Sequence, residues 1–574
     1  MYYYSAKLAK DQPCGLTSKD FTEFNYAAIV YAKTAILFDY LMNFVGEGAF
    51  DEGMRFYFEN YKFKHPQPLD LKKVLAYYGE KDLSWLFDDM IGTTKKLDYK
   101  ICGFKKTEGG TYDVVIKNNS NVKGPIAVCG IKNGKIRGMV WYEGFEGEKT
   151  LQFPPAEIDE FKIDYFGFMP EINRQNNTIR IKGIFKKIEP IKLEFIGAID
   201  NPNKTQLFWT PIAGYNEYNK GMLGLAVYNH ALFQKKIEID LAPLYSFGSN
   251  NICGYGKIQG NIALDNNFIQ QISLGVKSSR FAYATNEKVK DPLNFTKIEP
   301  YPNIEFGKKN KRSPITQHIA YRMVNISRDS KDPYGIIYTA SPSVYSINDL
   351  RYTLENKRTI NPFKIMVNAQ VGNGMSKASV TANFSISTKP KKSIDIRFFA
   401  GKMFGISSNG DYRFRMSGQT GFQDYLYDNI YFGRSTLSPS NIGFQQFSEN
   451  DGAFKVWCLN GQSDNWLSTV NIKSPKLFKL PLLAYADFGV FSTNVTNIIN
   501  GVVTGPKPSD SELMYSFGVG IPLIKNAFEI YIPLYNSKNI NDGLKNFSFA
   551  ETIRFTLNLN MANPFNIIKN VMPL

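Results

Sequence analysis

Histidine and cysteine are scarce in this chain, which has 574 residues. The three histidines are His65, His230 and His318, and none is followed by glutamate. The sequence therefore contains no HExxH zinc helix, and no Ser-His-Asp arrangement is readily available. The five cysteines show no CxxC spacing. They are too few for a disulfide-dense scaffold, so we expect structural or free thiols.

Long hydrophobic runs are also missing, since no stretch of about 18 uninterrupted apolar residues occurs. The longest apolar neighbourhood, residues 26–45, contains Lys33 and Asp39. This composition is typical of a buried or amphipathic helix rather than of a bilayer span. Residues 1–7 lack a basic segment followed by an apolar core, so they do not have the pattern of a signal peptide.

Acidic residues are outnumbered by basic ones. There are 68 Lys and Arg against 52 Asp and Glu, for a net charge of +16. The positive charge is spread over lysines, and no helix-turn-helix, ribonucleoprotein or zinc-finger signature accompanies it. We therefore expect no nucleic-acid partner. A solvated basic surface, or one that faces anionic lipid headgroups, accounts for the charge.

Three regions differ in pattern and together predict a multidomain α+β protein. Residues 1–98 are expected to be helical. Residues 99–190 contain about seven short strand patterns separated by turn residues, which predicts a small β-sandwich. Residues 191–574 alternate strictly between apolar and polar side chains and predict a large antiparallel β-barrel. The clearest alternating segments are residues 237–241, 378–386, 394–398, 513–521 and 553–560.

The alternation has two interpretations. Strands of about ten residues with aromatic residues near their ends are typical of an outer-membrane barrel with a watery lumen. The competing interpretation is a soluble sandwich or barrel with an apolar core. We favour the membrane barrel because the apolar faces carry many Phe and Tyr, while the opposite faces carry charged residues. About twelve strands are countable, and long outward loops are expected at 286–313, 404–411 and 417–453.

One helical segment resembles a known family. Tyr-Ala-Ala-Ile-Val-Tyr-Ala-Lys at residues 26–33 is similar to the Tyr-x-x-x-x-Tyr-x-Lys helix of the HExxH zinc aminopeptidases, gluzincins related to alanyl aminopeptidase and leukotriene hydrolase. The resemblance covers residues 20–185 and includes Met-Arg-Phe-Tyr-Phe at 54–58 and Leu-Ser-Trp-Leu-Phe-Asp at 83–88. Residues 163–177 resemble the end of the domain that follows the peptidase unit. Beyond these residues the chain is similar in pattern to members from outer-membrane bacteria that carry a β-rich extension.

The resemblance implies that Tyr31 is the family's transition-state tyrosine. A phenol with a pKa of about 10 stays protonated at neutral pH. It can donate a hydrogen bond to the oxyanion that forms when zinc-bound water attacks a peptide carbonyl. Tyr26 lies about 140° away on an α-helix and can line the cleft as a neighbour. Thr34 stands where many members have glycine, and a tyrosine taken alone is most often a core or interface residue in a chain with 34 Tyr.

Zinc is implied by the family, but its ligands are not in this chain. HExxH and a later Glu would precede Tyr31, and nothing resembling them occurs. His65 precedes Pro66 and fits a turn, whereas His230 and His318 fall within expected barrel strands. We therefore expect either the C-terminal part of a longer protein or a degenerate enzyme. Such a chain should not cleave peptides alone.

The resemblance and the patterns together predict the C-terminal portion of a zinc metallopeptidase, an aminopeptidase acting on peptide substrates. It would contain the helical end of a thermolysin-like peptidase domain, a β-sandwich and a barrel held in outer-membrane lipid. The first two parts would lie in the periplasm. One alternative is a non-catalytic outer-membrane barrel or channel with a small periplasmic binding module. Another is a wholly soluble β-rich binding protein.

Overall fold

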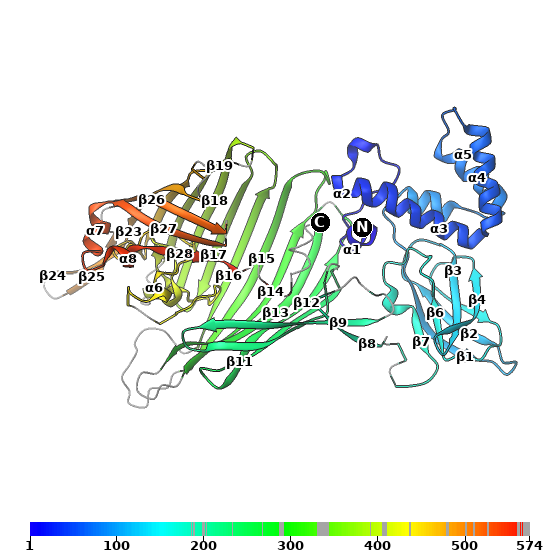
Figure 1. Cartoon of the computed structure of the whole chain (residues 1–574), viewed down its shortest axis with the longest axis horizontal. Helices are drawn as coiled ribbons and strands as arrows, with labels where there is room; N and C mark the ends of the chain where they lie inside the picture. Colours follow the sequence, from blue (N-terminus) through cyan, green and yellow to red (C-terminus); the bar gives the residue numbers. More distant parts are fainter. Residues whose placement is uncertain are drawn as a thin grey trace.

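A computed structural model places helices first, two small sheets next and a closed barrel last (Figure 1). It describes residues 1–559 together with 563 and 565, with some positions excepted. The exceptions are 185, 188–189, 198–200, 202–203, 232–233, 267, 286–291, 330–343, 391, 405–409, 436–437, 478–480, 500–501, 509–510 and 525–526. Residues 1–184, which precede the barrel, are called the N-terminal module below.

The helices of the module occupy its first part. They are α1 (Tyr2–Lys7), η1 (Ser18–Asp20), α2 (Glu23–Asn25), η2 (Tyr26–Lys33), α3 (Thr34–Val45), α4 (Glu47–Tyr61), α5 (Pro68–Gly79) and η3 (Trp85–Ile91). The stretch Glu23–Val45 is long and apolar enough to cross a membrane by length and composition. In the fold, however, its Leu37, Tyr40 and Leu41 are buried in the module's core. The stretch ends at Gly46, whose φ of +93° only glycine adopts readily.

Seven strands of the module form two sheets. One has the order β1 (Tyr99–Lys106), β2 (Tyr112–Asn118), β5 (Glu148–Phe153), and the other β4 (Lys135–Tyr142), β3 (Ile126–Lys132), β6 (Glu160–Ile163), β7 (Thr178–Arg180). Phe161 of the second sheet packs against Tyr112 and Phe153 of the first, with ring centroids 5.3 and 5.4 Å apart. The two sheets therefore face one another across a shared apolar core.

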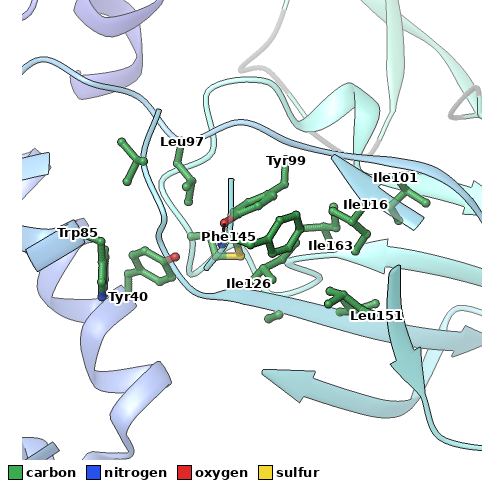
Figure 2. Close-up of a cluster of buried hydrophobic side chains, with 14 of the residues drawn as sticks. Tyr40, Trp85, Leu97, Tyr99, Ile101, Ile116, Ile126, Phe145, Leu151 and Ile163 are labelled. Atoms are coloured by element: carbon green, nitrogen blue, oxygen red, sulfur yellow. Dashed lines mark hydrogen bonds between the residues drawn. The ribbon is translucent and has the colours of Figure 1, made fainter. Parts of the chain in front are cut away.

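Aromatic side chains join the helices to the sheets. Figure 2 shows Tyr40 and Trp85 on the helical side, beside Tyr99 and Phe145. The rings of Tyr40 and Trp85 lie 4.9 Å apart between centroids. The Tyr40 hydroxyl donates to the Pro125 carbonyl, and the Tyr99 hydroxyl donates to the Gly124 carbonyl at 2.7 Å. Because each buried phenol has an acceptor, the joint packs without an unpaired hydroxyl.

Seventeen described strands close into the barrel. They are β8 (Ile191–Phe195), β9 (Thr205–Asn216), β10 (Lys220–Tyr228), β11 (Ile237–Ser246), β12 (Asn251–Ala263), β13 (Ile269–Thr285), β14 (Pro292–Phe306), β15 (Ile315–Arg328), β16 (Val344–Asn356), β17 (Phe363–Gly372), β18 (Met375–Lys389), β19 (Lys392–Phe404), β22 (Trp466–Lys473), β23 (Leu483–Ser492), β26 (Glu512–Ile524), β27 (Phe528–Asn536) and β28 (Arg554–Leu557). The count exceeds the expected twelve because several strands hide their alternation. β8 and β28 are short, and β14 contains Pro300 and Pro302. β14 also occupies most of the expected outward loop 286–313, whose residues 286–291 lie outside the described residues.

The barrel wall is apolar outside and polar inside. On β11, Ile237 is 58% exposed and Leu241 48%, whereas Glu238 and Asp240 between them are buried. The same outward series of exposed apolar side chains continues around the wall. Members are Ile258, Ile262, Leu274, Val276, Ile298, Leu350, Val367, Val380, Phe384, Ile386, Phe398 and Leu513. An exposed apolar belt of this extent is what a membrane-spanning barrel presents to lipid.

The connection from β19 to β22 fills the lumen instead of projecting outward. This corrects the expectation of an outward loop at 417–453; of the loop expected at 404–411, residues 405–409 lie outside the described residues. Residues 410–465, called the plug, include η5 (Gly410–Tyr412), β20 (Phe414–Arg415), η6 (Gly421–Gln423), α6 (Ile442–Gln445) and β21 (Gln462–Ser463). The plug contacts strands on opposite sides of the barrel, which only an internal segment can do. Contacts include Tyr345 of β16 to the Tyr425 carbonyl, Thr469 of β22 to the Gly452 carbonyl, and Arg554 of β28 to the Ser417 carbonyl.

Ion pairs fasten the plug to the wall. The Asp428 carboxylate lies 2.6 Å from the Lys297 ammonium of β14 and 2.7 Å from the Arg322 guanidinium of β15. Lys297 also contacts Glu299 at 2.9 Å, and Arg322 contacts Asp349 at 2.6 Å. These charges are largely withdrawn from solvent, so each depends on its partners for stabilisation.

The module contacts one end of the barrel, called the proximal end below. This end carries the turns that join β12 to β13 and β14 to β15. Lys10 pairs with Glu305 at 2.9 Å, and the Gln270 amide donates to the Leu8 and Ala9 carbonyls at 3.0 and 3.1 Å. Lys311 donates to the Asp11 carbonyl at 3.0 Å. The plug and the helices α7 (Lys538–Gly543) and α8 (Phe549–Thr552) connect to strands at the opposite, distal end.

Replacing Asp428 with alanine should destabilise the folded barrel by up to about 3 kcal/mol, because Lys297 and Arg322 would lose a carboxylate inside the wall. Samples are incubated in SDS at increasing temperatures and then run on a gel. The measurement is the incubation temperature at which the compact band of the folded barrel disappears. Asp542→Ala is the matched control, since its ion pair with Lys545 is exposed at the distal end. Equal transition temperatures for the two variants would contradict this role of Asp428.

Glu171 is a buried carboxyl at the junction of helices and sheets. Its Oε1 accepts the Tyr99 backbone N–H at 2.7 Å. Burial raises the pKa of this carboxyl well above its ordinary value, and the hydrogen bond from Tyr99 opposes the rise. The folded pKa is therefore higher than the unfolded pKa. Its contribution to stability is complete below the unfolded pKa and is lost as the pH rises through the folded value.

Glu171→Gln should therefore change the unfolding temperature of the module little at about pH 4 and raise it at about pH 8. The amide keeps an oxygen for the Tyr99 N–H but carries no charge. Unfolding can be followed by the fluorescence of Trp85 and Trp141, which lie in the module. The control is Glu143→Gln, because Glu143 is exposed and forms an ion pair with Lys81. An equal effect of Glu171→Gln at both pH values would reject the assignment.

Candidate functional site

Tyr26 and Tyr31 form an exposed aromatic pair on the first long helix. Their rings meet edge to face, with centroids 5.9 Å apart and planes at 77°. Tyr31 is 63% exposed and Tyr26 is 40% exposed. The neighbouring Tyr26 phenol raises the pKa of Tyr31 above its ordinary value. Tyr31 therefore stays protonated at neutral pH and keeps a proton that it can donate.

The local helix type brings the two rings together. Residues Tyr26–Lys33 form a π-helix, in which each N–H bonds to the carbonyl five residues before it. Positions five apart are therefore close neighbours here, instead of about 140° apart as on the α-helix expected from the sequence. The Thr34 hydroxyl donates to the Ile29 carbonyl, also five residues back, at 3.2 Å. Thr34 thus supports the π-helical turn.

The opposite face of this helix is anchored by Lys33, a residue of the motif whose role the sequence did not indicate. Its side chain is fully buried, and its ammonium donates to the Thr93 carbonyl, just past the end of η3, at 3.2 Å. Burial lowers the pKa of Lys33, while Cys14 and Asp11 oppose that change. This contact ties η2 to η3, so the exposed face with Tyr26 and Tyr31 is held on a fixed support.

The described residues do not fit a zinc site. No group of three His, Cys, Asp or Glu side chains within this part of the chain is arranged to hold a metal ion. His65 is exposed in the turn after α4. His318 lies in β15, but His230 follows the end of β10, which corrects its expected place within a strand. His230 is buried beside the lumen, with Nε2 2.6 Å from the Asp240 carboxylate.

Comparison with known families finds one match, confined to the helical region. Residues 8–90 match the model of the Peptidase family M1 domain. The matched residues include Tyr26, Tyr31 and Lys33 and end within η3. No curated protein matches the chain. The similarity therefore concerns the helices that carry the tyrosine pair and does not extend to the sheets or the barrel.

Among solved structures, the chain is similar to barrel proteins. CdiB from Acinetobacter baumannii shares 12% identity with a TM-score of 0.29, over 58% of this chain and 57% of that one. BamA from Haemophilus ducreyi lacking POTRA domains 1–3 shares 8% with a TM-score of 0.32, over 59% and 70%. The copper transporter OprC shares 8% with a TM-score of 0.25, over 77% and 61%. The chain thus aligns with less than two thirds of the CdiB chain. Because these TM-scores are low, the evidence for the barrel is the strand pairing of this chain itself.

The purified 574-residue chain should hold far less than one zinc ion per molecule after treatment with a chelator and addition of one equivalent of Zn²⁺. Stable binding needs three or more correctly placed ligands, and the described residues supply no such group. Elemental analysis of the desalted protein measures the bound metal. One zinc ion retained per chain would contradict the prediction.

Proposed function

We propose that this chain is the C-terminal portion of a zinc aminopeptidase of the gluzincin type, held at the outer membrane by its barrel. The match of residues 8–90 to the Peptidase family M1 domain carries the proposal. Within the matched segment, Tyr31 is exposed on a rigid support. The zinc ligands and the general base would be supplied by residues outside this sequence, since the described residues do not fit the metal.

Tyr31 is the residue of this chain that we assign to the reaction. Its phenol is protonated at neutral pH and can donate a hydrogen bond to the oxyanion that develops on a peptide carbonyl. Tyr26 lies beside it, since the two rings meet edge to face with their centroids 5.9 Å apart. The partner of this face is therefore a peptide substrate, and the activity of the whole protein is removal of N-terminal residues.

The barrel is the proposed membrane anchor. Its exposed apolar belt suits lipid contact, and its charged side chains point to the plugged lumen. The longest connections lie at the distal end and the module docks at the proximal end. In outer-membrane barrels short turns face the periplasm, so the helices and the two sheets would lie there. Outer-membrane lipid is then the second partner, and we propose no nucleic-acid partner.

A second candidate is a non-catalytic outer-membrane barrel with a periplasmic binding module. The lack of a fitting zinc group among the described residues favours it. An open channel is the less favoured version, because the plug contacts strands on opposite sides of the lumen. The two candidates differ in whether a protein extended by any residues encoded before Met1 contains an HExxH motif and hydrolyses aminoacyl substrates.

In that N-terminally extended protein, Tyr31→Phe should lower kcat by about 10²–10³-fold, because one oxyanion donor is lost. Bound zinc, measured by elemental analysis, should stay unchanged. Tyr77→Phe is the matched control, since Tyr77 is also an exposed tyrosine of the matched helices, at 78% exposure. Unchanged turnover of Tyr31→Phe would reject the role of Tyr31. An extended protein without zinc or hydrolysis would support the non-catalytic candidate.

A further inference from the structure

Basic residues crowd the proximal end of the barrel. They lie in the turns that join consecutive strands there, or at the strand ends beside those turns. The exposed members, called the basic rim, are Lys236, Lys309, Arg312, Lys357, Arg358, Lys389, Lys392 and Lys476. The described residues of the same turns contain one acidic residue, Asp265, and it is already bound to Thr94 and Lys311.

Several cations of the rim have no partner within the described part of the chain. No hydrogen bond or ion pair involves the ammonium groups of Lys389, Lys392 or Lys476 there. Lys389 and Lys392 are also directly paired across the turn from β18 to β19. Like charges opposite each other in a strand pair repel, so this arrangement is unfavourable unless an anion lies nearby.

The rim borders the apolar belt directly. Ile386 lies three residues before Lys389, and Leu477 follows Lys476; both side chains are exposed. Ile360 is exposed two residues after Arg358. A ring of cations at the edge of a lipid-facing wall lies at the depth of lipid headgroups. Where the module docks, Lys311 and Arg312 instead bind its backbone carbonyls, so the free part of the rim lies away from the module.

We propose that the basic rim binds the phosphate groups of anionic phospholipids in the leaflet at the proximal end. The inference rests on the proposed membrane barrel and adds the lipid class that the barrel selects. The occupant follows from position and charge: the rim is cationic and continuous with the apolar belt, and its Lys389, Lys392 and Lys476 have no partner among the described residues. The described residues at the distal end instead carry both signs, among them Glu217, Lys220, Lys538, Asp542, Lys545 and Glu551. Lipid binding at the basic rim therefore orients the chain.

The test uses the full chain reconstituted in phosphatidylcholine vesicles with a trace of spin-labelled phosphatidylglycerol or spin-labelled phosphatidylcholine. Electron spin resonance gives the fraction of each label held at the protein surface. We expect phosphatidylglycerol to associate about two- to fivefold more strongly than phosphatidylcholine at low salt. The preference should fall as salt shortens the screening length.

The triple variant Lys389→Gln, Lys392→Gln and Lys476→Gln should reduce this preference markedly. The matched control is Lys220→Gln, Lys538→Gln and Lys545→Gln, which removes the same charge from exposed lysines at the distal end. It should keep the preference. Equal association of both labels with the unaltered chain, or equal loss in both triple variants, would overturn the inference while leaving the membrane barrel intact. A chain that inserts into neither lipid mixture would overturn the barrel as well.

Discussion

The structure depends on one constraint, the closure of a sheet whose two faces must meet different surroundings. Because successive side chains of a strand point to opposite faces, each strand of the barrel places apolar residues outside and polar residues inside. Closure leaves no long open edge in the wall, but it encloses charges such as Asp240, Glu299 and Arg322. These enclosed charges need partners, and the plug supplies one of them in Asp428, which pairs with Arg322.

The plug explains why the lumen is not simply a water channel. Asp428 brings a carboxylate to Lys297 and Arg322, and Arg554 of β28 donates to a plug carbonyl. The guanidinium of Arg554 also stacks on the rings of Phe447 and Trp457, 4.2 and 4.9 Å from their centroids. Both rings belong to the plug, so this buried arginine would lose these contacts without it. Barrel and plug thus form one packed unit.

The N-terminal module is attached to this unit by polar contacts at the proximal turns. Its own rigidity comes from elsewhere, from the Tyr40–Trp85 joint and from buried Lys33, which tie the helices to the sheets and to each other. The exposed tyrosine pair is therefore presented on a firm support at the end of the barrel. In the proposed enzyme, this arrangement would hold the oxyanion donor at a constant position while the barrel keeps the protein at the membrane.

The sequence alone was enough to predict a barrel, because period-two alternation over residues 191–574 is a local property of each strand. It also indicated the helix with Tyr26 and Tyr31, and it showed that no histidine-based zinc motif is present. It did not predict the strand number, since short β8 and β28 and the prolines of β14 carry no clear alternation. Only the tertiary structure decided that residues 417–453 turn inward. The sequence of a polar, aromatic connection is the same whether its side chains contact water or the charges of the lumen. The π-helical turn that joins the two phenols and the gathering of scattered lysines into one rim likewise depend on how distant segments meet in space.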